Sequence, residues 1–148
     1  MLFKTPVGTL TLGYIDNNLR CEFGEKKVER EPPKKLVKQL EQYLHGEQVD
    51  WFDVNTPDGP PFVKKCWEAC RSIPYGKTIS YKNLATKAGS PRASRAAGQA
   101  MRMNPLTILT PCHRVIASNA SVHGYAGSTY LNSPQLKRKM YLLNLECK

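Results

Sequence analysis

Acidic side chains are scarce in the C-terminal part of this 148-residue chain. Residues 61–148 contain only Glu68 and Glu146 against 14 Lys and Arg residues, a net charge of +12, whereas residues 1–60 carry −2. A protein that is simply kept soluble by lysine would not divide its charge so sharply. The asymmetry favours a polyanionic partner, and nucleic acid is the commonest one.

Long apolar runs are also lacking, because no stretch approaches the roughly 20 residues that a membrane-spanning helix needs. The first residues, MLFKTPVGTL, have neither the apolar core nor the cleavage site of a secretory signal. We therefore expect a soluble, monomeric protein of the cytoplasm, or of the nucleus in a eukaryote, with no membrane partner. The length suits one compact domain or two small ones.

The five cysteines do not form a pattern typical of disulfides or of metal binding. Their number is odd and there is no secretory context, so reduced thiols are expected. Cys66 and Cys70 are four residues apart, but no second Cys/His pair stands at a suitable spacing for zinc. The sequence thus predicts neither a metal site nor a cofactor.

The N-terminal region has the pattern of a small sheet with a helix. Apolar and polar residues alternate over 9–12, turn formers occupy 16–18, and a second apolar run covers 19–23, which predicts an antiparallel hairpin. Residues 33–46 show helical spacing of Leu and Tyr. The turn-rich residues 54–61 are the best linker. We therefore expect an N-terminal domain over 1–57 and a second domain over 58–148.

The second domain is predicted to be mainly helical and winged-helix-like, which makes the whole chain α+β. One helical face is predicted for Phe62, Cys66, Trp67, Cys70 and Ile73. A short helix ends at Gly89, and the next is predicted to begin with Ser90 as N-cap and Pro91 at the first helical position, ending at Asn104-Pro105. These two helices have the outline of a helix-turn-helix. A last helix is predicted over 133–146, with Leu136, Met140 and Leu143 facing inward and Tyr141 as a further candidate for that face.

The second helix of this pair has an unusual composition. A polar, basic stripe joins Arg92, Arg95, Gln99 and Arg102, and the residues between are small: Ala93, Ala96, Ala97, Gly98 and Ala100. Such a face can contact phosphates while the small residues allow close approach to a groove. The same alanines would also serve a tight helix–helix contact beneath a solvated charged face. Periodicity leaves both interpretations open.

A cysteine, a histidine and an arginine follow one another at 112–114, in the run "LTPCHRVIAS". A thiol reacts as its thiolate and needs a neighbouring base or cationic surroundings, which His113 and Arg114 could supply to Cys112. A Cys-His dipeptide also arises by chance between structural residues. The wider sequence has to decide.

Four segments stand in a familiar order: "IPYGKTISYKNLA" (73–85), "SPRASRAAGQAMRMNP" (90–105), "PCHRVI" (111–116) and "GYAG" (124–127). With the terminal "LLNLE", they resemble the O6-alkylguanine-DNA alkyltransferases. The resemblance implies a DNA repair protein that flips O6-alkylguanine out of duplex DNA and transfers the alkyl group, once and irreversibly, to its own Cys112. It covers nearly all of the second domain, whereas the N-terminal region matches only in general style.

The resemblance also assigns roles. It implies a catalytic set in which His113 deprotonates Cys112 through a water, Glu146 orients His113, Tyr81 protonates the leaving base, and Asn104 ties the recognition helix to the active-site loop. It implies a base pocket formed by Val115, Tyr125, Ala126 and Met101. It implies a minor-groove surface formed by Arg92, Ser94, Arg95, Ala96, Gln99 and Arg102, with Arg95 entering the base stack.

Three other functions remain as alternatives. A damage-binding protein of the same fold would lack the motif cysteine, which is present here as Cys112. A transcriptional helix-turn-helix protein would carry that cysteine incidentally, and a cysteine hydrolase would turn over repeatedly. The chain departs from the family's glycine-rich loop at Ala120, His123 and Ser128, which bears on the range of alkyl groups accepted.

Overall fold

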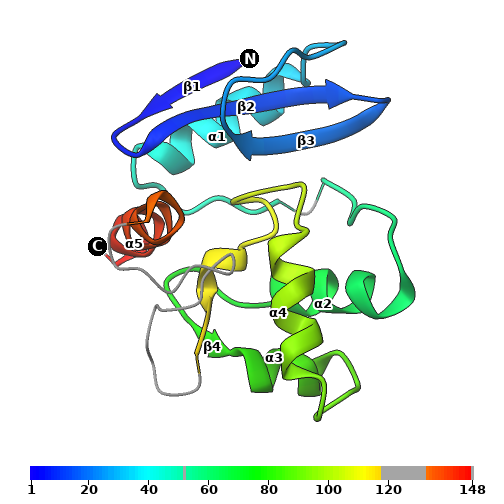
Figure 1. The fold of residues 1–148 in the computed structure, drawn as a ribbon. Helices are drawn as coiled ribbons and strands as arrows, with labels where there is room; N and C mark the ends of the chain where they lie inside the picture. Colours follow the sequence, from blue (N-terminus) through cyan, green and yellow to red (C-terminus); the bar gives the residue numbers. More distant parts are fainter. Residues whose placement is uncertain (52, 118–132, 148) are drawn as a thin grey trace.

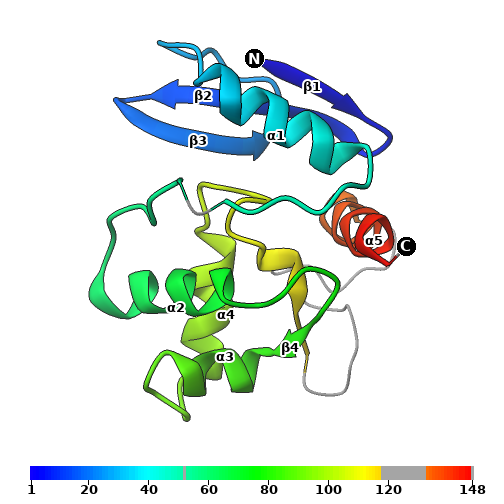
Figure 2. The same cartoon turned by 180° about the vertical axis from the view of Figure 1, so that it is seen from behind.

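The structure, a computed structural model, describes residues 1–51, 53–117 and 133–147, and it has two layers (Figure 1). One layer is a sheet covered by a helix, and the other is a group of helices. The last helix lies at the seam between them, as both views show (Figure 2). The predicted α+β class is confirmed.

The N-terminal layer is an antiparallel sheet in the order β1-β2-β3, formed by β1 (Leu2–Thr5), β2 (Gly8–Ile15) and β3 (Asn18–Phe23). The predicted hairpin is β2–β3, with Leu12 opposite Cys21. Its two-residue loop, Asp16-Asn17, has φ values of 50° and 63°, as a type I′ turn requires. Helix α1 (Lys34–Leu44) covers one face of the sheet through its buried Leu and Tyr side chains.

The second layer contains α2 (Pro61–Arg71), α3 (Tyr81–Lys87) and α4 (Ser94–Arg102), all packed on one another. A short parallel ladder joins β4 (Ile79–Ser80) to β5 (Val115–Ile116), and a 3₁₀ turn, η1 (Cys112–Arg114), precedes β5. The turn between α3 and α4 contains Gly89 at φ 90°, so the predicted helix-turn-helix is confirmed. The chain closes with α5 (Pro134–Glu146).

Two hydrophobic cores result, and the chain crosses between them more than once. The first core combines the sheet and α1 with Leu106, Ile108 and Leu109 and with Leu142 and Leu145 of α5. The second core is made by α2, α3 and α4 with Cys112, Val115 and Leu136. The boundary at residues 57 and 58 therefore stays a prediction, because the first core also takes residues from the far end of the sequence.

The prediction for the start of α4 was wrong. The helix begins at Ser94, and Ser90 is not its N-cap, because the Ser90 carbonyl accepts a hydrogen bond from the Ala93 amide at 2.9 Å. Residues 90–93 thus form a turn, in which Pro91 occupies the second position that proline favours. Arg92 consequently lies before the helix and not on it.

The predicted inward face of α5 was also wrong in register. Leu136 is buried as expected, but Met140 is 44% exposed and Leu143 is only partly buried. Lys139, Leu142 and Leu145 take the inward positions instead. The inward face includes a lysine, Lys139, so the apolar residues alone do not mark the buried face of α5. No helix in the described ranges is both long and apolar enough to span a membrane.

Candidate active site and nucleic-acid interface

Asn104, just after α4, ties that helix to the segment that carries the cysteine. Its side-chain Nδ2 donates to the Thr110 carbonyl at 2.8 Å, and its Oδ1 accepts from the Leu106 amide at 3.0 Å. The amide therefore spans the loop from both sides. The Asn104 side chain thus joins the end of α4 to the residues that precede Cys112.

The same loop is anchored to the N-terminal sheet. The Cys21 amide of β3 donates to the Pro105 carbonyl at 2.9 Å, and the Thr107 amide donates back to the Cys21 carbonyl at 2.8 Å. Ile108 is fully buried with φ 76°, a left-handed conformation that costs a β-branched residue about 1–3 kcal/mol. Such a conformation persists because the surrounding hydrogen bonds and packing over-determine it.

The turn η1 places three consecutive candidate site residues under the surface. Cys112, His113 and Arg114 are 4%, 0% and 6% exposed. The Cys112 amide donates to the Thr110 carbonyl at 2.7 Å, which orients the residue. Cys112 lies in the second core with Cys70 and Tyr81, while His113 and Arg114 turn toward the C-terminal end of α5.

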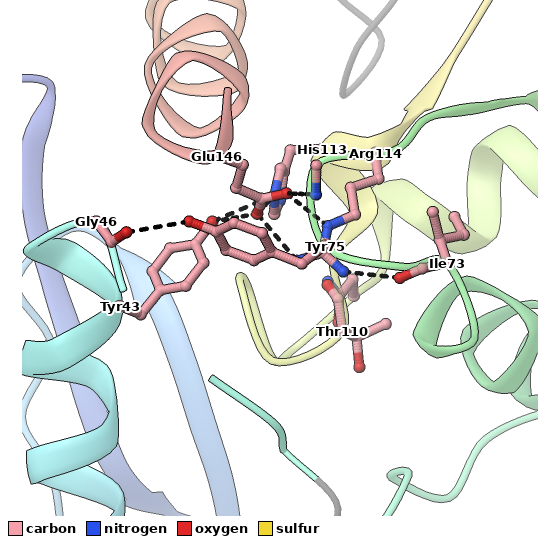
Figure 3. A network of polar contacts seen from close by, with 10 residues as sticks. Tyr43, Gly46, Ile73, Tyr75, Thr110, His113, Arg114 and Glu146 are labelled. Atoms are coloured by element: carbon pink, nitrogen blue, oxygen red, sulfur yellow. Dashed lines mark hydrogen bonds and ion pairs between the residues drawn. The ribbon is translucent and has the colours of Figure 1, made fainter. Parts of the chain in front are cut away.

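Glu146 is the centre of a buried polar network (Figure 3). Its Oε2 accepts from the Tyr43 hydroxyl at 2.5 Å, from His113 Nε2 at 2.6 Å and from Arg114 Nη2 at 3.0 Å. Its Oε1 accepts from Arg114 Nε at 2.8 Å and from the Gly76 amide at 3.1 Å. We refer to these five residues, Tyr43, Gly76, His113, Arg114 and Glu146, as the Glu146 network.

The network fixes the charge states of its members. Burial alone would raise the pKa of Glu146, but the hydrogen bonds from His113 and Arg114 outweigh it and hold that pKa well below its usual range. Burial lowers the pKa of His113, against the opposing effect of Glu146, so its imidazole is neutral at pH 7. Because Nε2 faces the carboxylate, Nε2 carries the proton and Nδ1 has the free lone pair. Nδ1 is buried without a hydrogen-bond partner in the described structure.

Tyr81 lies on the Cys112 side of the site, at the first position of α3. The Ser80 hydroxyl accepts from the Asn83 amide and caps this helix. Burial, and then the neighbouring thiols of Cys112 and Cys70, raises the pKa of Tyr81 to about 12. Its phenol therefore keeps its proton at neutral pH and can act as a hydrogen-bond donor.

A buried lysine completes the surroundings of Tyr81 and Cys112. Lys139 of α5 donates from Nζ to the Val115 carbonyl at 2.5 Å, and its Nζ lies 5.8 Å from the centre of the Tyr81 ring. Burial lowers the pKa of Lys139 to about 8, although the nearby Cys112 acts in the opposite direction.

Two of the four predicted pocket residues are described. Val115 and Met101 are both buried in the second core. Tyr125 and Ala126 lie outside the described residues, as do Ala120, His123 and Ser128. No group of three or more His, Cys, Asp or Glu side chains within the described ranges is arranged to hold a metal ion.

Helix α4 has two distinct faces, one packed on the rest of the second layer and one exposed. Ala97, Ala100 and Met101 are buried, and Trp67 Nε1 donates to the Ala100 carbonyl at 2.9 Å. The opposite side is exposed and carries Arg95, Ala96, Gln99 and Arg102. We refer to these four residues as the exposed face of α4.

The exposed face of α4 has few internal partners for its charges. Arg95 has no hydrogen bond or ion pair to any described residue, and Arg102 only approaches Gln99 at 3.4 Å. Ser94, partly buried, begins the helix, and Arg92 is exposed in the preceding turn. Unpaired cations on a helix with small neighbours suit contact with a phosphate backbone.

The sequence did not predict the contacts that Tyr43, Arg114 and Lys139 make at the candidate site. From the sequence, Arg114 was only a cation next to Cys112, whereas in the structure it donates two hydrogen bonds to the Glu146 carboxylate. Tyr43 showed only the helical spacing of a core residue. Lys139 stands three residues after Leu136 and three before Leu142, so the spacing of α5 could have placed it inside.

The chain is similar to known proteins over nearly its whole length. Residues 61–148 match the family model "6-O-methylguanine DNA methyltransferase, DNA binding domain". A methylated-DNA–protein-cysteine methyltransferase of Methanosarcina acetivorans is 38% identical and is covered over 96% of its length by 98% of this chain.

Solved structures agree with these sequence matches. The crystal structure of Mycobacterium tuberculosis OGT in complex with DNA is 34% identical, with a TM-score of 0.79 over 99% of this chain and 91% of that one. The structure of S. pombe Atl1 in complex with damaged DNA containing O6-carboxymethylguanine is 33% identical, with a TM-score of 0.50 over 61% of this chain and 79% of that one.

Proposed function

The chain belongs to the 6-O-methylguanine DNA methyltransferase family, and on that premise we propose how its residues divide the reaction among them. It is a DNA repair alkyltransferase that binds DNA, with methylated-DNA–protein-cysteine methyltransferase activity. The nucleophile is Cys112 and the lesion is O6-alkylguanine in a duplex. The alkyl group stays on the sulfur, so each molecule acts once.

The first step is removal of the thiol proton. Neutral His113 takes it at Nδ1 through a bridging water, because Nε2 is engaged with Glu146. Glu146 orients the ring and stabilises the imidazolium that forms, while Arg114 keeps the carboxylate ionised. Lys139 lies close enough to Cys112 for their charges to interact.

The second step is displacement at the alkyl carbon. Cys112 Sγ forms a bond to that carbon, the bond from carbon to guanine O6 breaks, and its electron pair remains with the base. Tyr81 donates a proton to a ring nitrogen of the departing guanine, consistent with a phenol whose pKa is about 12. The Tyr81 phenolate then regains a proton while the His113 imidazolium releases the one it took, by way of solvent. The overall result is one thioether and one guanine, with both side chains returned to their starting protonation states.

The base must leave the stack before the sulfur can reach it, at a cost of a few kcal/mol. The exposed face of α4 would lie in the minor groove, with Ala96 allowing close approach and Arg102 and Gln99 contacting the backbone. Arg95, exposed and without an internal partner, would fill the space that the flipped base leaves. Asn104 would keep α4 in register with the reacting cysteine.

The observation that carries this proposal is the histidine beside the cysteine. His113 is fully buried and neutral, and its Nε2 donates to the Glu146 carboxylate, which accepts four further hydrogen bonds. Only Nδ1 of His113 can therefore act as a base. A cysteine next to an incidental surface histidine would show none of these features.

The test is intact mass after incubation with an oligonucleotide containing O6-methylguanine. We expect one added methyl group per molecule and no more, located by peptide mapping at Cys112. Cys112→Ser should remain unmodified and still bind the DNA, with affinity that falls as salt rises. Repeated turnover would reject the proposal, as would methylation of Cys66 while Cys112 stays unmodified.

A further inference from the structure

The N-terminal layer contributes one polar side chain to the Glu146 network, and this is Tyr43 of α1. Its hydroxyl donates to Glu146 Oε2 at 2.5 Å, and the same oxygen lies 3.4 Å from His113 Nε2. Figure 3 shows it approaching the carboxylate from the side opposite Arg114. It is the only residue of the network from the first 60 residues, and it touches both members of the His–Glu pair.

Tyr43 is held in this place by its own surroundings. Its side chain is fully buried in the first core. Its ring packs edge-on against Tyr75, with centroids 6.3 Å apart, and at a tilt against Trp51 at 6.2 Å. A tyrosine that served packing alone would gain nothing from placing its hydroxyl on a buried carboxylate, and phenylalanine would fill the same space.

We propose that Tyr43 is a positioning residue for alkyl transfer, which sets the strength of the Glu146–His113 hydrogen bond and so couples the N-terminal layer to the reaction. This rests on the proposed function, in which His113 is the base. Tyr43 shares Oε2 with His113 and withdraws part of the carboxylate's negative charge. Glu146 therefore orients the imidazole without binding its proton too tightly.

The electrostatics around the pair define the direction of the effect. The titratable and charged groups that face it in the described structure are Tyr43 from α1, Tyr75 after α2, Arg114 from η1 and Lys139 from α5. Burial, and next the charge of Glu146, raises the pKa of Tyr43 far above its usual value, so it remains a donor at any working pH. Without that donor, Glu146 favours the imidazolium more strongly, and the pKa of His113 rises.

The experiment is the pH–rate profile for alkylation of Cys112 by free O6-benzylguanine, a substrate that needs no DNA contact. Tyr43→Phe removes the hydroxyl and keeps the ring. We expect the acidic midpoint of the profile to move up by about half a unit to one unit, which corresponds to a roughly three- to tenfold loss of rate at pH values well below the midpoint. An unmoved midpoint would overturn the proposal.

Tyr75→Phe is the matched control. The Tyr75 hydroxyl also joins the two layers, donating to the Gly46 carbonyl at 3.4 Å, but it does not hydrogen-bond to Glu146. This variant should leave the midpoint in place. An equal shift in both variants would mean that contact between the layers, and not the bond to Glu146, is responsible, which also overturns the proposal.

A second measurement protects the test against a fold defect in Tyr43→Phe. Incorporation of 3-fluorotyrosine at position 43 strengthens the donor, so the midpoint should move down instead of up, and a midpoint that rises or stays fixed rejects the coupling. Failure here is distinguishable from failure of the proposed function: in the first case Cys112 is still alkylated with an unaltered profile, and in the second it is not alkylated at all.

Discussion

The exposed face of α4 and the Glu146 network both depend on arginine, but the two arginine environments are opposite. Arg95 is exposed and has no partner in the described structure, whereas Arg114 is 6% exposed and donates two hydrogen bonds to one carboxylate. An unpaired surface cation is available to an external anion. A paired buried cation is not, and it serves to hold other groups in place.

The contrast between an exposed and a buried arginine indicates which region should affect stability and which should affect DNA binding. Stability depends little on exposed charges, and surface substitutions usually change it by no more than about 0.5 kcal/mol. Removing one member of a buried pair leaves the other charge uncompensated. Substitutions in the network should therefore affect folding and chemistry with any substrate, while substitutions on the exposed face should affect only reactions on DNA.

The largest effect is expected from Glu146→Gln. The amide cannot neutralise Arg114 or accept all five hydrogen bonds, so the free energy of unfolding should fall by about 3–5 kcal/mol. Chemical denaturation of this variant beside Arg95→Ala makes the comparison direct, because Arg95→Ala should unfold like the parent. A loss below 1 kcal/mol in Glu146→Gln would show that the network does not stabilise the fold.

A second buried cation, Lys139, should make the free energy of unfolding depend on pH. Burial lowers its pKa from 10.5 to about 8, so the unfolded chain binds this proton more tightly than the folded one. The resulting destabilisation is complete below pH 8 and disappears as the pH rises toward 10.5. The difference in unfolding free energy between Lys139→Met and the parent should thus change by about 2–3 kcal/mol between pH 7 and pH 10.

The matched control for this experiment is Lys137→Met, two residues earlier on α5, where the lysine is exposed. Its stability difference from the parent should stay flat over the same pH range. Comparing each variant with the parent also removes the alkaline titration of the buried Cys21, Cys66 and Cys70, which is common to all three proteins. A flat curve for Lys139→Met would mean that the lysine is solvated in solution.

The next effect concerns DNA alone. If Arg95 fills the space of the flipped base, Arg95→Ala should slow repair of duplex DNA about 30-fold, equivalent to about 2 kcal/mol of the flipping cost, and leave reaction with free O6-benzylguanine unchanged. Single-turnover rates at saturating DNA measure this. Arg102→Ala, which removes a proposed phosphate contact, should weaken binding but not the saturated rate. Equal losses on both substrates in Arg95→Ala would remove the base-flipping role.

The features of the molecule also differ in how well the sequence predicted them. Local patterns placed the hairpin, because alternation and the Asp16-Asn17 turn act within a few residues, and they placed the helix-turn-helix for the same reason. The cysteine motif predicted the candidate site, since Cys112, His113 and Arg114 are neighbours in the chain. Each of these features depends on residues close together in sequence.

What the sequence missed depends mostly on partners from distant segments, with one local exception at the start of α4. Tyr43 and Glu146 are 103 positions apart in the sequence, and nothing in the sequence of α1 predicts that the Tyr43 hydroxyl contacts a carboxylate. Lys139 was not among the residues predicted to face inward, because a lysine is rarely buried without a partner, and its partner, the Val115 carbonyl, is a backbone atom that no pattern can reveal. Ser90-Pro91 suited both an N-cap and a turn, and the Ala93–Ser90 hydrogen bond selected the turn.

The smallest expected effect separates the two faces of α4 themselves. A Cβ added at Gly98 would lie 3.8 and 3.9 Å from the Tyr81 ring atoms Cδ1 and Cε1, which is ordinary contact, so Gly98→Ala should stabilise the helix by about 0.5–1 kcal/mol. It should leave duplex repair unchanged, because the added methyl points toward Tyr81 and not outward. Ala96→Leu, on the exposed face, should do the reverse, lowering DNA affinity without changing thermal unfolding. If Gly98→Ala impaired duplex repair as much as Ala96→Leu, the helix would have to meet DNA through the side that packs on Tyr81, and the division between the two faces would be wrong.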